Sequence, residues 1–248
     1  MSGPAQPRVV LVTGAAGTMG EATARRLVAD GYRVALSDVS DGRLKPLVSE
    51  LGHAAYAITA DLSLPDEAAR VVAEAEKALG PVDILINNAG ILSNLKSADT
   101  TLSEWRRVLA INLDASFILS RRVLPGMKER RFGRIVNVCS LAMKSGGLTA
   151  GTAYTTSKGA LAALTFSLAR EAAAFGVTVN AISPAYVKTP MVMEQLTEAQ
   201  RKALLAQIPV GRFCEPEEFA HCVAFLVSPL SGFITGEILD LNGGLHFD

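Results

Sequence analysis

Short apolar runs alternate with longer amphipathic stretches along most of the chain. The apolar runs lie at 8–12, 33–37, 54–59 and 84–86, and the stretches with helical periodicity follow them at 19–30, 42–51, 66–79 and from residue 102 onwards. A strand followed by a helix, repeated in this way, is typical of parallel strands joined by crossover helices that cover both faces of the sheet.

The second half of the chain continues the alternation. Further strands are predicted at 134–138, 178–181 and 238–241, and further helices at about 154–175 and 216–226. The strands are almost uninterrupted apolar runs, such as VVLV and DILI, because a parallel sheet is buried on both faces. The pattern predicts a doubly wound, Rossmann-like α/β sheet of about seven strands in one domain, residues 9–248, after a flexible tail, residues 1–8.

The composition excludes several classes of protein. Apolar residues make up 49% of the chain and charged residues 19%, with 24 basic and 24 acidic side chains, a profile typical of a globular enzyme. This balance predicts neither a nucleic acid nor an anionic membrane as a partner, since both are bound by clustered positive charge. No stretch approaches the roughly 18 consecutive apolar residues of a membrane span. We therefore expect a cytoplasmic protein.

The cysteines and histidines do not suggest a metal site. The three cysteines show no CxxC spacing, and His53, His221 and His246 are scattered without the spacing of metal ligands. We expect no metal, and we expect each histidine to be a surface or structural residue. The G-x-S-x-G turn of a serine hydrolase is also absent from the sequence.

A glycine-rich turn follows the first predicted strand and opens directly into a helix. The segment 13–20, TGAAGTMG, contains Gly14, Gly17 and Gly20, and glycines there let backbone N–H groups approach a pyrophosphate at the positive end of a helix. Many such turns are only helix caps.

Asp38 strengthens the cofactor hypothesis, because an acidic residue at the end of the second strand can accept hydrogen bonds from the adenosine ribose and repel a 2′-phosphate. The alternative for Asp38 is a turn or cap residue. The predicted cofactor is NAD.

Three side chains in the second half suggest proton-transfer chemistry. Tyr154 and Lys158 are four positions apart and share one face of a predicted helix. The ammonium and a positive nicotinamide ring would favour the phenolate and bring the tyrosine pKa, ordinarily near 10, towards neutral pH. Ser140, at the end of the fifth strand, can stabilise a developing alkoxide. Taken alone, the pair could be a surface pair and Ser140 a strand-end cap.

The order of these motifs resembles that of the short-chain dehydrogenase/reductase family. The resemblance rests on the segments 13–20, 87–90 and 184–189 together with Asn112, Ser140, Tyr154 and Lys158. It implies a homotetramer or dimer and a set of cofactor contacts. Asp61 and Leu62 would flank the adenine, and Asn88 and Ala89 would lie along the adenosine ribose. Val187 and Thr189 would contact the nicotinamide carboxamide. The pyrophosphate would lie on the glycine-rich turn, at Gly14, Gly17, Thr18, Met19 and Gly20. Asn112 would support the lysine through water. The sequence departs from the family pattern at Thr18 and at Ala185, where the family usually has glycines.

The expected activity is the NAD(H)-dependent interconversion of a secondary alcohol and a ketone, with an apolar, uncharged substrate. Two alternatives remain: a reductase of 3-oxoacyl thioesters, and a catalytically silent dinucleotide-binding protein. The substrate is expected among segments 91–96, 141–152 and 186–205, the last of which is either an amphipathic lid, with apolar positions Met191, Val192, Met193, Leu196, Leu204 and Leu205, or a packed helix. We expect Lys96, Lys144 and Lys188 in these segments to point to solvent.

Overall fold

The computed structural model describes residues 7–190, 193 and 197–247. Most of the predicted N-terminal tail, residues 1–6, lies outside the described residues. So do Met191, Val192 and Leu196, on which the predicted lid depends.

The strands form one parallel sheet in the order β3-β2-β1-β4-β5-β6-β7, which confirms the predicted fold class. The strands are β1 (Val9–Thr13), β2 (Arg33–Asp38), β3 (Ala55–Thr59), β4 (Val82–Asn87), β5 (Gly133–Val138), β6 (Val177–Pro184) and β7 (Ile238–Leu241). Several are longer than predicted, because backbone pairing continues into polar residues such as Asn87, which pairs with Asn137 of β5.

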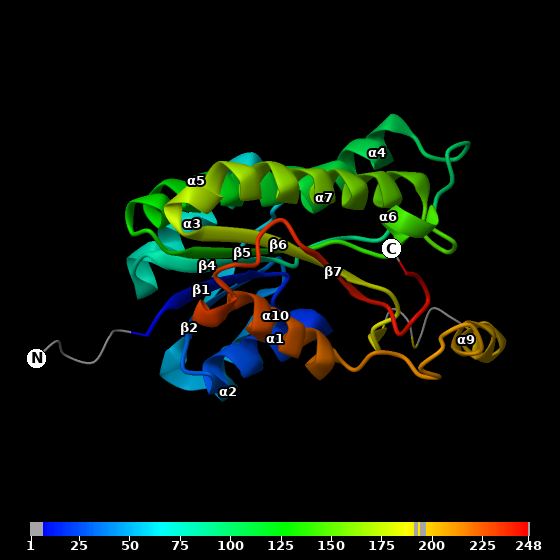
Figure 1. Ribbon diagram of the computed structural model, residues 1–248, viewed down its shortest axis with the longest axis horizontal. Coiled ribbons are helices and arrows are strands. Elements are labelled where there is room, and N and C mark those ends of the chain that lie inside the picture. The colour runs from blue at the N-terminus through cyan, green and yellow to red at the C-terminus, as the bar shows by residue number, and fades with distance from the viewer. Residues whose placement is uncertain (1–6, 191–192, 194–196, 248) are drawn as a thin grey trace, which may run out of the picture.

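Helices cover both faces of the sheet (Figure 1). One face carries α3 (Pro65–Leu79), α4 (Leu102–Leu109), α5 (Ala115–Glu129) and α7 (Thr152–Ala172), and the other carries α1 (Thr18–Ala29), α2 (Asp41–Leu51) and α10 (Pro216–Val227). Successive strand side chains point to opposite faces: Val10 and Val12 pack in the core beneath α1 and α10, whereas Leu11 packs in the core beneath α3 and α5. This alternation explains why the strands read as unbroken apolar runs.

The helix predicted from residue 102 is in fact interrupted. α4 ends at Leu109, a π-helical turn follows at Ala110–Asp114, and α5 then begins. The turn holds Asn112, which is completely buried. Its side chain accepts a hydrogen bond from the Ile91 N–H at 2.8 Å and donates one to the Ile91 carbonyl at 3.0 Å. Such turns are frequent at functional sites because they redirect one side chain out of a regular helix.

Two short helices lie near the carboxyl edge of the sheet; the first was not predicted, and the second falls within the 186–205 stretch that was expected to be helical. α6 (Ala142–Ser145) follows β5, and α9 (Glu198–Leu205) starts at a capping box in which Thr197 and Gln200 bond each other's backbone N–H groups. Within the described ranges, no helix has the length and apolar character needed to cross a bilayer. Within the same ranges, no three His, Cys, Asp or Glu side chains form a group that could hold a metal ion.

A buried chain of amide groups ties the centre of the sheet to α7. Asn87 donates from Nδ2 to Asn137 Oδ1 at 2.8 Å, and Asn137 donates from Nδ2 to Thr165 Oγ1 at 2.9 Å. Asn137 and Thr165 are completely buried. Because these groups have left water, each depends on its partner for its hydrogen bond. These hydrogen bonds fix α7, which carries Tyr154 and Lys158, on β4 and β5.

We predict that Asn137→Ala lowers the free energy of unfolding by about 1–3 kcal/mol, because it removes one partner from each of two buried polar groups. Urea denaturation monitored by circular dichroism measures this change. The control is Asn94→Ala at an exposed position, where the change should stay within about 0.5 kcal/mol. Equal effects of the two substitutions would show that the buried amides do not hold the helix.

Candidate active site

The ends of β1 and β4 are joined by polar side chains. Thr13 Oγ1 accepts hydrogen bonds from the N–H groups of Asn88 and Ala89 at 3.1 and 3.0 Å. In return, Asn88 Nδ2 donates to the carbonyls of Thr13 and Gly14 at 2.9 and 3.0 Å. The strand order reverses between β1 and β4, and ligands of open α/β sheets bind outside the carboxyl ends of the strands at this point.

The glycine-rich turn is shaped by this junction. Gly14 has a φ of +60°, and a Cβ on it would lie 2.8 Å from Ala89 Cα, so only glycine fits there. A Cβ on Gly20 would lie 2.3 Å from the Gly14 carbonyl oxygen. α1 starts at Thr18 after Gly17, which provides no side-chain cap. The first N–H groups of a helix have no intrahelical partner, so this end of α1 can bind an anion such as a pyrophosphate.

A cavity of about 400 Å³ extends along this edge. It brings together eleven of the predicted cofactor residues: Gly14, Gly17, Thr18, Met19, Asp38, Asn88, Ala89, Tyr154, Lys158, Val187 and Thr189. The other three do not line it. Gly20 packs against the turn, Leu62 is buried in the core, and Asp61 is exposed and accepts a hydrogen bond from the Ser63 N–H at 2.9 Å.

The cavity fits a nicotinamide dinucleotide. Asn88 Oδ1 is buried and has no hydrogen-bond partner among the described residues, which leaves an acceptor for ribose hydroxyl groups beside the open end of α1. Val187, which also lines the cavity, forms a parallel backbone bridge with Cys214. A bound dinucleotide would supply or accept a hydride at the substrate carbon.

Lys158 is buried at the junction of the strands and α7. Its Nζ donates to the Val138 carbonyl at 2.6 Å and lies 5.8 Å from the centre of the Tyr154 ring. Burial lowers the pKa of Lys158 to about 8. A Cβ on Gly90 would lie 3.3 Å from this Nζ and 3.2 Å from Asn112 Oδ1, so the backbone at Gly90 passes close to both side chains.

The pKa of the Tyr154 hydroxyl is shifted upwards in the protein without cofactor. Burial raises the pKa of the Tyr154 hydroxyl above its usual value, and a hydrogen bond with Ser140 only partly opposes this. The decrease expected from the sequence concerns the complex with a positively charged nicotinamide ring and stays a prediction; without cofactor, loss of solvent dominates and raises the pKa. At neutral pH the tyrosine keeps its proton, as a proton donor requires.

Asn112 acts on α7 through a neighbour. Its Nδ2 donates to Ser157 Oγ at 3.0 Å, and Ser157 Oγ donates to the Tyr154 carbonyl at 2.7 Å. With its two bonds to Ile91, the side chain connects the segment after β4 to the first turns of α7. Asn112 is thus a positioning residue in this structure.

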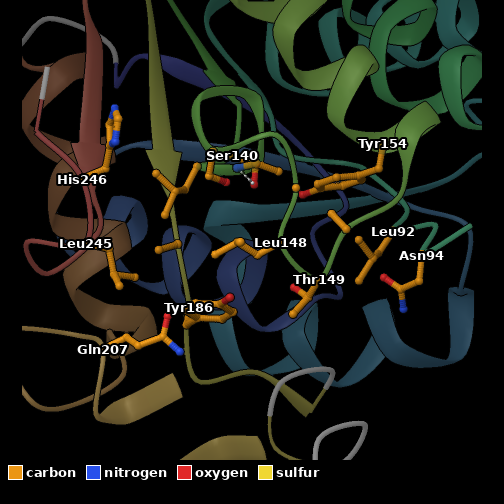
Figure 2. A pocket seen from close by; sticks show the side chains of 16 residues that line it. Leu92, Asn94, Ser140, Leu148, Thr149, Tyr154, Tyr186, Gln207, Leu245 and His246 are labelled. Carbon is orange, nitrogen blue, oxygen red and sulfur yellow. Dashed lines mark hydrogen bonds between the residues drawn. The ribbon is translucent and has the colours of Figure 1, made fainter. Parts of the chain in front are cut away.

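A second cavity, of about 310 Å³, opens beside the first. Leu92, Ser140, Tyr154 and Ala185 line both cavities. Figure 2 shows the second cavity, in which Ser140 and Tyr154 lie at one end and the Tyr186 ring lies across from them. Two of the four predicted catalytic side chains, Ser140 and Tyr154, therefore stand where a substrate and a cofactor would meet.

The second cavity, called the substrate cavity below, is lined by parts of the segments expected around a substrate and by residues that the sequence did not reveal. Segments 91–96 and 141–152 contribute as expected, and Tyr186 contributes from the third. Gln207, Leu245 and His246 were missed, since they lie after α9 and after β7, far from any motif. His246 lies in the cavity wall, and its expected role as a surface or structural residue stays a prediction. Arg43 of α2 was likewise missed in the cofactor cavity.

The three lysines near the substrate segments do not simply point to solvent. Lys96 Nζ donates to the carbonyls of Gly147 and Ala150 at 2.8 and 2.6 Å. Lys144 forms an ion pair with Asp240 at 2.7 Å, and Lys188 forms one with Glu215 at 3.2 Å. Lys96 and Lys188 are exposed, as expected, but each also has an acceptor; the expectation is wrong for Lys144, whose side chain is only 16% exposed because it pairs with Asp240.

Comparison with known proteins agrees with this geometry. A family model described as enoyl-(acyl carrier protein) reductase matches residues 14–246. An acetoacetyl-CoA reductase of Rhizobium meliloti is 41% identical over 97% of this chain and 99% of its own length, and one from Shinella zoogloeoides is 40% identical over the same shares.

Two further matches extend the comparison. A 3-oxoacyl-[acyl-carrier-protein] reductase of Vibrio cholerae is 38% identical over 96% of this chain and 97% of its own length. Among solved structures, a blue fluorescent protein from a metagenomic library, in complex with NADPH, superimposes with a TM-score of 0.91 at 34% identity, covering 97% of this chain and 98% of the other. The chain belongs to the short-chain dehydrogenase/reductase family of oxidoreductases.

Proposed function

We propose that this protein reduces the 3-oxo group of an acyl thioester to the 3-hydroxy group with NADH. The observation that carries the proposal is that Ser140 and Tyr154 line both the cofactor cavity and the substrate cavity. Ser140 would hold the substrate carbonyl oxygen, and Tyr154 would donate its proton to that oxygen as the hydride reaches the carbon. The Lys158 charge would stabilise the tyrosinate left behind.

The lining of the substrate cavity supports the thioester over the apolar ketone that the sequence suggested. Besides Ser140 and Tyr154, the wall contains Asn94, Ser145, Thr149, Tyr186, Gln207 and His246 among its leucines and alanines. A 3-oxoacyl thioester carries a second carbonyl and an amide-rich carrier arm, which can use these hydrogen-bonding groups. The names of the relatives point to the same class of substrate. An apolar ketone or secondary alcohol remains the second candidate.

The preference for NADH rests on Asp38. Its carboxylate lines the cofactor cavity and is fixed by the N–H groups of Ala16 and Ser40 at 3.0 and 3.1 Å. A 2′-phosphate on the adenosine ribose would meet this fixed negative charge. Arg43 lines the same cavity and would partly offset it, but its guanidinium donates to the Ala16 carbonyl.

Assembly into a homotetramer is also part of the proposal. Phe117 of α5 and Phe166 of α7 are 44% and 51% exposed on the outer side of these helices. Aromatic side chains at this exposure are candidates for a contact with a second copy of the chain.

We predict that the wild-type protein reduces acetoacetyl-CoA with NADH and that Tyr154→Phe lowers kcat by at least about 100-fold, because the proton donor is lost. NADH binding, measured by fluorescence titration, should stay within about threefold, since the ring still packs. The control is Tyr56→Phe on exposed β3, which should retain activity. Turnover of Tyr154→Phe within about tenfold of the wild type would remove Tyr154 from the mechanism.

We predict that kcat/KM is at least about tenfold higher with NADH than with NADPH, a difference of ~1.4 kcal/mol. Asp38→Ala should lower the NADH to NADPH ratio of kcat/KM by removing the negative charge, and Arg43→Met should raise this ratio. Steady-state kinetics with both coenzymes measures the three ratios. A wild-type preference for NADPH that Arg43→Met abolishes would assign the coenzyme choice to Arg43 instead.

We predict that kcat/KM for NADH falls as the pH rises through about 8, where Lys158 loses its proton in the free protein. The sign follows because the charged lysine, present below this pH, binds the cofactor and stabilises the tyrosinate. Lys158→Met should lower the rate at all pH values and flatten this decrease. A decrease of the same size in Lys158→Met would show that another group titrates.

A further inference from the structure

Two loops form neighbouring walls of the substrate cavity. Leu92 and Asn94 lie on the loop after β4, and Leu148 and Thr149 lie on the loop before α7. The second loop leads directly into α7, whose N-terminus at Thr152 is two residues before Tyr154. The relative position of these loops therefore affects both the shape of the cavity wall and the start of the helix that carries the proposed proton donor.

The Lys96 ammonium connects the two loops. Lys96 belongs to the first loop, and its Nζ donates to the carbonyls of Gly147 and Ala150 in the second at 2.8 and 2.6 Å. Hydrogen bonds from a charged donor are about twice as strong as neutral ones. Gly146 and Gly147 have φ angles of +76° and +75°; the Gly147 carbonyl lies in this left-handed turn, and the Ala150 carbonyl lies three residues after it.

Backbone contacts close the same junction. The Gly151 N–H donates to the Ser93 carbonyl at 2.7 Å, and the Thr152 N–H donates to the Leu95 carbonyl at 3.0 Å. A Cβ on Gly151 would lie 2.3 Å from the Leu95 carbonyl oxygen. The two loops thus touch backbone to backbone beside the lysine, so a change in the lysine contacts reaches the first turn of α7.

We propose that Lys96 is a positioning residue that holds the two walls of the substrate cavity together and fixes the start of the Tyr154 helix. Its effect on the reaction rests on the proposed function, whereas its effect on the loops does not. Lys96 contacts neither the cofactor cavity nor the reacting groups, so it should govern substrate binding and leave cofactor binding unchanged.

The test compares Lys96→Met with Lys96→Arg, which can still donate to both carbonyls, and with Lys128→Met. Lys128 pairs with Glu171 at 2.5 Å and serves as the matched control for loss of one lysine contact. The first measurement is hydrogen exchange by mass spectrometry over residues 145–153. Exchange in Lys96→Met should be about tenfold faster than in the wild type, whereas Lys96→Arg and Lys128→Met should match the wild type.

The second measurement is the kinetics of acetoacetyl-CoA reduction, with NADH affinity measured separately. Lys96→Met should raise the KM for acetoacetyl-CoA by about 3- to 10-fold, lower kcat by a smaller factor, and leave the NADH Kd unchanged. Lys96→Arg should restore the wild-type KM. Unchanged exchange, or faster exchange with unchanged KM, would overturn the proposal. If the wild type reduces no 3-oxoacyl thioester, the proposed function fails, and the exchange measurement alone decides whether Lys96 holds the loops.

Discussion

The hydrogen bonds between Thr13 and Asn88 join the two central strands at the point where the strand order reverses. They bring Gly14 so close to Ala89 that no side chain fits between them. One consequence is the tight turn that leaves the first N–H groups of α1 open to an anion. The other consequence is the path of the chain after β4. Along this path Gly90 lies close to Lys158, and the Ile91 N–H donates to Asn112 Oδ1.

The chemistry of the site depends on how water is excluded from this junction. Lys158 is buried against the Val138 carbonyl, and its pKa falls, while burial raises the pKa of the Tyr154 hydroxyl. Both shifts follow from one cause, because a buried group disfavours its charged form. The result is a protonated tyrosine beside a lysine that remains charged at neutral pH. This pair suits proton donation to a carbonyl that is being reduced.

The sequence predicts the sheet and the motif residues because both depend on local patterns. Apolar runs mark the strands, and the glycine turn, Ser140 and Tyr154 follow strand ends or share a helix face. It does not predict the π-helical turn around Asn112, since the partners of this side chain, Ile91 and Ser157, are 21 and 45 positions away in the sequence. Gln207 and His246 have no local signal at all. They reach the cavity only through the packing of the chain after α9 and β7.

The central claim is that a substrate carbonyl between Ser140 and Tyr154 lies next to the reactive end of the cofactor. Transfer of label tests it most directly: acetoacetyl-CoA is reduced with NADH deuterated on both C4 positions of the nicotinamide, and the product is analysed by mass spectrometry and NMR. We predict one deuterium per product molecule, located on the carbinol carbon. Product without deuterium at that carbon, or no product, would contradict it.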